Sequence, residues 1–127
     1  MVRYRFTPDR HFPRHGEQGP DPDAVADAFA GVVRALMAEF AVSALVITGL
    51  EVRRDYLVEH ANGQAVGPEQ PGPPIHHLAR EECWGGLESG GLGVQVGYDF
   101  HLVVATPRHC PDAEAIAQSV ALFVESL

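Results

Sequence analysis

The chain contains no lysine, so its nine basic residues are all arginine. Its seventeen acidic residues give the 127-residue chain a formal net charge of −8 at pH 7. Nucleic acids are bound through clustered basic groups, and this balance therefore argues against nucleic-acid binding by the body of the protein. The absence of lysine also argues against a lysine-containing phosphate-binding loop.

Cysteine and long apolar runs are scarce as well. Two cysteines are too few for a disulfide scaffold, so we expect free thiols and a cytoplasmic location. No apolar run approaches the ~20 residues that span a bilayer, and the N-terminus lacks the apolar segment of a signal peptide. Length and composition indicate a single domain over residues 1–127 without membrane association.

The arginines that are present are unevenly placed. Four of the nine lie within the first fourteen residues: Arg3, Arg5, Arg10 and Arg14. Residues 1–20 therefore form a basic N-terminal strand and loop on an acidic body. Val2, Tyr4 and Phe6 alternate with arginine, as in a strand with one buried face. We expect an edge strand whose arginines prevent aggregation, with an anion or nucleic-acid contact as the less favoured alternative.

Three segments carry helical signals. Residues 22–41 follow a capping aspartate, begin with proline, and repeat apolar residues every three or four positions. A short helix is expected from Pro73 or Pro74 to about Trp84. A third helix is expected from Pro111 to the end of the chain. Its apolar stripe consists of Ile116, Val120, Phe123 and Leu127.

The remaining segments indicate strands and loops. Residues 43–50 and 56–60 are expected to form a hairpin, and residues 61–74 form a Gly/Pro-rich loop expected to be mobile. Residues 90–96 and 100–106 form either a second hairpin or one bent strand. The predicted fold is an α+β two-layer sandwich, with a mainly antiparallel sheet flanked by helices in the order β-α-β-β-α-β-β-α. A ferredoxin-like β-α-β-β-α-β order with an added C-terminal helix is the alternative.

One buried cluster is expected to unite the helices and strands. Its predicted members are Phe29, Val32, Leu36, Phe40, Leu45, Ile47, Leu102, Val104, Ile116, Val120 and Phe123.

Residues 21–127 resemble the roadblock (dynein light chain LC7-type) family and its profilin-like relatives at the level of topology. The matching features are the amphipathic helix, the segment SALVITGLEVRRDYLVEH, a short helix, and GVQVGYDFHLVVATP before the last helix. The resemblance implies a small non-enzymatic scaffold, commonly a dimer that extends a sheet or pairs helices.

Residues with reactive side chains occur without the spacings that catalysis or metal binding requires. Seven histidines show no zinc-binding spacing, and no serine lies in a nucleophile elbow, so we expect no catalytic residues, metal site or cofactor. A ligand pocket is the alternative. Its candidate residues are His76, His77, Trp84, Tyr98 and His101.

Cys110 is the one candidate reactive thiol. It precedes the third helix, where backbone amides lower a thiol's pKa, and His109 lies beside it. We expect Cys110 to react faster than Cys83, which is assigned to the core side of the second helix.

The leading hypothesis is a non-enzymatic regulatory or scaffold module that acts through protein–protein association, as a homodimer. The second hypothesis is a small-molecule-binding or catalytic domain with the histidine and aromatic pocket described above.

Overall fold

The computed structural model describes residues 1–15, 19–52, 60–69, 71–80, 83–97 and 100–127. Twelve elements follow one another in these ranges. They are β1 (Val2–Pro8), β2 (Arg14–His15), β3 (Gly19–Pro20), α1 (Pro22–Glu39), β4 (Leu45–Val52), β5 (Ala65–Val66), α2 (Gly72–Ala79), β6 (Cys83–Ser89), β7 (Leu92–Gly97), β8 (His101–Thr106), α3 (Pro111–Ser119) and β9 (Leu122–Ser126).

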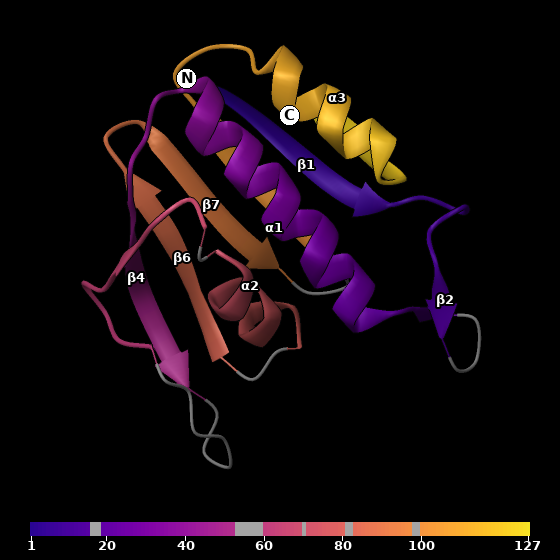
Figure 1. The fold of residues 1–127 in the computed structure, drawn as a ribbon, viewed down its shortest axis with the longest axis horizontal. Helices are drawn as coiled ribbons and strands as arrows, with labels where there is room; N and C mark the ends of the chain where they lie inside the picture. The colour runs from indigo at the N-terminus through magenta and orange to yellow at the C-terminus, as the bar shows by residue number, and fades with distance from the viewer. Residues whose placement is uncertain (16–18, 53–59, 70, 81–82, 98–99) are drawn as a thin grey trace.

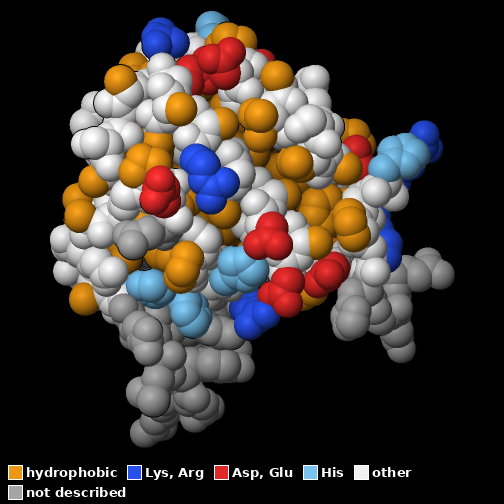
Figure 2. Space-filling model, viewed as in Figure 1, with side chains coloured by type: hydrophobic (Ala, Val, Ile, Leu, Met, Phe, Trp, Pro, Cys, Tyr) orange, Lys and Arg blue, Asp and Glu red, His pale blue; other side chains and the backbone are white. Residues whose placement is uncertain are grey.

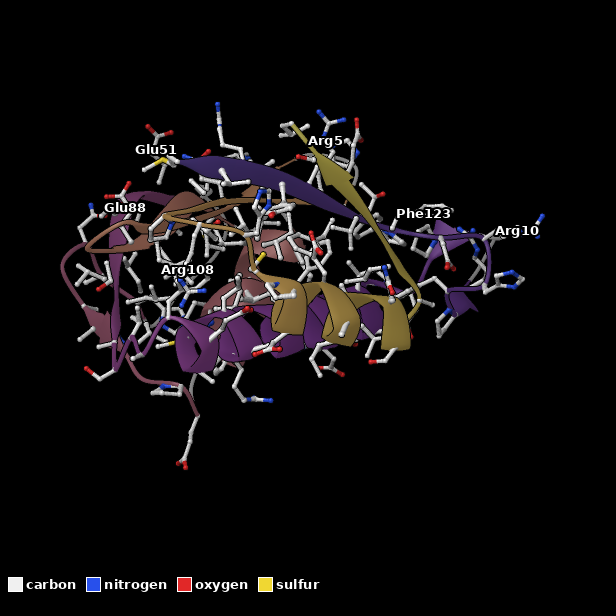
Figure 3. All side chains as sticks on the ribbon, turned by 90° about the horizontal axis from the view of Figure 1, so that it is seen from above. Arg5, Arg10, Glu51, Glu88, Arg108 and Phe123 are labelled. Atoms are coloured by element: carbon white, nitrogen blue, oxygen red, sulfur yellow. The ribbon has the colours of Figure 1, made fainter. Side chains whose placement is uncertain are left out.

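Seven of the strands form one antiparallel sheet in the order β5-β4-β6-β7-β8-β1-β9. The helices lie together on one face of this sheet, with α1 between α2 and α3 (Figure 1, Figure 3). The predicted α+β class and the mainly antiparallel sheet are therefore confirmed. The core fills the space between the sheet and the helices, where Phe6, Phe29 and Leu36 are fully buried.

Helix α1 forms where the sequence predicts it. The Asp21 side chain accepts a hydrogen bond from the Asp23 amide at 3.1 Å, and Pro22 occupies the first turn. The apolar positions of α1 that recur every three or four residues are buried against the sheet. This pattern requires only local spacing, so the sequence alone identifies it.

The end of the chain differs from the prediction. Helix α3 stops at Ser119, Ala121 takes a left-handed conformation with φ of 60°, and residues 122–126 continue as strand β9 beside β1. The predicted helix to Leu127 is therefore wrong. Aromatic and β-branched residues in the sequence LFVES favour a strand once an unpaired edge of β1 is available.

Strand β9 also changes the position of the N-terminal strand. Because β1 pairs with β8 on one side and with β9 on the other, it lies inside the sheet and is not the predicted edge strand. The expected alternation is confirmed, since Tyr4 and Phe6 are buried and Arg3 is exposed.

The central strands also depart from the predicted order. The second helix ends at Ala79, and the segment from Cys83 is strand β6, so three strands separate α2 from α3 where two were expected. Residues 92–97 and 101–106 form the two paired strands β7 and β8, which excludes the single bent strand. Neither predicted element order is observed.

The expected mobile loop carries regular structure. Strand β5 pairs with β4, and Val66 is buried. The Arg34 side chain donates a hydrogen bond to the Pro68 carbonyl at 3.1 Å. Most of the predicted strand at residues 56–60 lies outside the described residues.

Glu39, near the end of α1, caps the start of α3. Its carboxylate accepts hydrogen bonds from the amides of Asp112 at 3.3 Å and Ala113 at 3.0 Å. An acidic group at a helix N-terminus satisfies amides that have no partner within the helix and interacts favourably with the helix dipole. The contact therefore fixes the position of α3 relative to α1.

We expect Glu39→Ala to lower the free energy of unfolding by about 1 kcal/mol, the usual effect of removing an N-cap. Chemical denaturation measures this loss. Glu39→Gln retains one acceptor oxygen and serves as the control, with a smaller loss. Equal stability of the alanine variant and the unchanged chain would contradict the capping role.

Candidate association surface

Exposed apolar side chains concentrate at the C-terminal end of the chain. Eight large hydrophobic side chains are exposed among the described residues, and half of them lie in the last twelve positions. We call these four residues the C-terminal patch: Ile116 (41% exposed), Val120 (37%), Phe123 (59%) and Leu127 (52%). The sequence predicts all four on one helix stripe, with Ile116, Val120 and Phe123 buried in the core, and both predictions are wrong.

The C-terminal patch lies at one edge of the molecule. Ile116 lies on α3, the helix farthest from α2, and Val120 is the C-cap residue of the same helix (Figure 1). Phe123 lies on β9, the last strand of the sheet, and pairs with Thr7 of β1 (Figure 3). Because Val124 lies opposite the buried Phe6, Phe123 and Leu127 lie on the outer face of the sheet, so the C-terminal patch flanks this edge on both faces of the sheet.

Strand β9 leaves one row of backbone groups unpaired within the described part of the chain. The Leu127 amide donates to the Arg3 carbonyl at 2.9 Å, and the Asp9 amide donates to the Ala121 carbonyl at 3.0 Å. Antiparallel pairing alternates, so the odd-numbered residues of β9 direct their backbone groups towards β1. The backbone groups of Leu122, Val124 and Ser126 consequently face away from the sheet.

This edge carries few of the features that normally prevent edge-to-edge pairing. The segment LFVES has no proline and no lysine. Its single charge, Glu125, lies 3.6 Å from the Arg5 guanidinium on the neighbouring strand, which partly neutralises it. The alternation of Leu122, Val124 and Ser126 with outward-facing residues is the sequence signal for this strand, and it was obscured by an equally good helical spacing.

The outer face of the sheet, away from the helices, is a second open surface. Strand register places one row of residues across it: Val46, Glu88, Gly93, Ala105 and Arg3. Figure 3 shows Arg5, Glu51 and Glu88 on this side of the sheet. Shallow hollows along β7 are lined by Gly86, Gly93 and Gln95. Antiparallel sheets often leave one such face in water.

The four arginines of the predicted basic arm separate into two places. Arg3 and Arg5 project from β1, whereas Arg10 lies in the turn after it and Arg14 begins β2. Arg10 donates a hydrogen bond to His11 Nε2 at 3.3 Å, and Arg14 donates to the Asp9 carbonyl at 3.4 Å. Because these groups are divided, they do not form one continuous basic strip.

The predicted pocket residues lie on different sides of the sheet. Histidines and charged residues gather where α2 meets α1 (Figure 2). There His76 Nε2 is 2.8 Å from Asp27 Oδ1, and an ion pair joins Arg80 to Asp23. The Arg80 hydrogen bond is the main cause that lowers the pKa of the Asp23 carboxyl.

The other predicted pocket residues do not join this cluster. The ring of His77 lies 5.2 Å from that of His60. Trp84 pairs with Glu51, and His101 pairs with Gly97, both across sheet strands. Tyr98 lies outside the described residues. The structure therefore does not bring the described members of this set into one pocket.

The activated thiol predicted at Cys110 is contradicted by its surroundings. Cys110 is fully buried, and the carboxylate of Glu39 already occupies the amides at the start of α3. Burial, with smaller contributions from Glu114 and Glu39, raises the pKa of Cys110 to about 11. Next to it, His109 Nδ1 lies 2.8 Å from the Tyr4 hydroxyl, at hydrogen-bond distance.

Cys83 is buried on β6 and not on the second helix as predicted. It lines a small apolar cavity between α2 and the sheet with Ile47, Leu78 and His60.

In the ranges that the structure describes, no helix has the length and apolar character needed to cross a membrane. No protein-family model, no curated protein and no solved structure matches this chain.

Proposed function

We propose that this chain is a non-enzymatic protein-association module that works as a homodimer in the cytoplasm. The observation that supports the proposal is the C-terminal patch, in which four large apolar side chains remain exposed at one edge. Exposed apolar side chains gathered at one edge are typical of association sites, whereas scattered exposed apolar residues are ordinary.

The energetic argument favours a partner at this edge. Fully burying a Val, Leu, Ile or Phe side chain contributes about 1.5–3 kcal/mol relative to leaving it exposed. Phe123 and Leu127 are more than half exposed, so covering them with a partner would contribute a large part of this burial free energy to association. The backbone groups along β9 add hydrogen bonds that water otherwise satisfies.

The resemblance to the roadblock family implies the same type of activity. Dimers that extend a sheet or pair helices use a free strand or an exposed helix flank, and α3 with β9 offers both. The family assignment itself stays a prediction. Neither a cofactor nor a catalytic residue has a role in the proposed function.

The proposal is tested by replacing one residue in the C-terminal patch and one outside it. We expect Ile116→Glu to convert a dimer into a monomer, because the new charge would be buried in the interface without a partner. Val52 is the matched control, since it is also 41% exposed but lies on β4, far from β9 in strand order.

Size-exclusion chromatography with light scattering reports the mass of each variant. The expected result is a dimer for the unchanged chain and for Val52→Glu, and a monomer for Ile116→Glu. Dissociation by Val52→Glu alone, with Ile116→Glu still dimeric, would place the interface elsewhere.

A further inference from the structure

We infer that the partner at this edge is a second copy of the chain, bound through antiparallel pairing of β9 with β9. The inference rests on the proposed homodimer and specifies its geometry. Two seven-stranded sheets would become one continuous sheet, with the two α3 helices side by side.

The positions of the unpaired backbone groups define the register. Leu122, Val124 and Ser126 direct their amides and carbonyls away from β1. A two-fold axis at Val124 places Val124 opposite Val124 of the second copy and Leu122 opposite Ser126. Leu122, Val124 and Ser126 of each copy then all form hydrogen-bonded pairs, which no other two-fold register of this strand achieves.

Charge supports the same register. With the axis at Val124, Glu125 lies opposite Phe123 of the second copy, and the two Phe123 rings are diagonal neighbours on the outer face. Moving the axis to Glu125 would place two like charges directly opposite, which is destabilising. The Glu125–Arg5 ion pair is retained in the favoured register, because it lies on the β1 side of β9.

The apolar side chains match a partner with the same two layers. Phe123 on β9 and Leu127 just after it lie on the outer face of the sheet, while Ile116 lies on α3 and Val120 caps the end of that helix. An extended peptide would cover the strand edge and leave much of the helix flank exposed. A second copy supplies both a strand and a helix, so it covers both parts of the C-terminal patch.

Proline at position 124 provides a selective test. The Val124 amide faces the free edge, so Val124→Pro removes a donor for the second copy and spares the amides that bond to β1. Proline is tolerated on an edge strand when its nitrogen faces solvent. Val124→Ala is the matched control, because it shortens the side chain and keeps the amide.

Light scattering is expected to give a dimer for the unchanged chain and Val124→Ala, and a monomer for Val124→Pro with unchanged circular dichroism. Hydrogen exchange of the unchanged chain gives a second readout that does not depend on a variant. The amides of Leu122, Val124 and Ser126 should become more protected as protein concentration rises, and those of Phe123 and Glu125 should not.

The outcomes separate this inference from the proposed function. A dimer that survives Val124→Pro and shows no concentration-dependent protection at Val124, but dissociates with Ile116→Glu, overturns the strand pairing and leaves the association module intact. An unchanged chain that stays monomeric at high concentration overturns both. If Val124→Pro fails to fold, the exchange measurement alone decides.

Discussion

Replacing Phe29 with alanine is expected to lower the free energy of unfolding by about 3–5 kcal/mol, the usual loss for a large-to-small change in a core. Phe29 lies on α1, is fully buried, and packs between the helix and the sheet. Core side chains are close-packed and relax little, so the cavity left behind would collapse only partly.

Urea unfolding of Phe29→Ala measures this loss, and Phe123→Ala is the control. Phe123 is 59% exposed, so in the monomeric chain its replacement should lower the free energy of unfolding by much less than the replacement of Phe29 does. Equal losses at both positions would contradict the strand assignment of residues 122–126 and favour the helix predicted from the sequence.

Alkylation of Cys110 in the folded protein is expected to be at least ~100-fold slower at pH 8 than that of an unhindered thiol, since little thiolate forms and reagent access is blocked. The physical causes are complete burial of the side chain and a pKa raised to about 11. Cys83 should also be protected by burial. The faster reaction of Cys110 that the sequence predicts should therefore not be observed.

Mass-spectrometric alkylation rates with and without denaturant test this directly, with both thiols reacting rapidly in the unfolded chain. Because the folded-state pKa of Cys110 is raised, its protonated form contributes stability below about pH 9, and this contribution is lost as pH rises towards about 11. Cys110→Ala should remove this contribution to the fall in the free energy of unfolding at alkaline pH. Rapid labelling of native Cys110 at neutral pH would contradict its buried position.

Local patterns explain which parts of the fold were predictable. Helix α1 follows from a capping residue, a proline and one apolar spacing, all within a short window. The alternation in β1 likewise identifies Tyr4 and Phe6 as buried residues. Such signals do not depend on distant parts of the chain.

The C-terminal segment shows why the rest was not predictable. Ile116, Val120, Phe123 and Leu127 repeat at helical spacing, yet residues 122–126 form a strand because β1 offers an unpaired edge more than a hundred positions earlier. Tertiary pairing of this kind overrides local propensity. Because the sequence predicts a helix here, it predicts neither the free edge of β9 nor the exposure of the C-terminal patch. The association surface can be identified only from the fold.

Cys110 gives the same lesson for chemistry. The sequence correctly places Cys110 at the start of a helix, but it does not show that the folded chain buries the thiol. Burial is the main cause that raises the pKa and reverses the expected direction of the shift, with smaller contributions from Glu114 and Glu39.

Native mass spectrometry of the unchanged chain, over a range of concentrations, tests the proposed association most directly. We predict a dominant species of twice the 13.7 kDa chain mass that dissociates on dilution, without a bound cofactor. A species of 13.7 kDa alone, at every concentration examined, would contradict the homodimer.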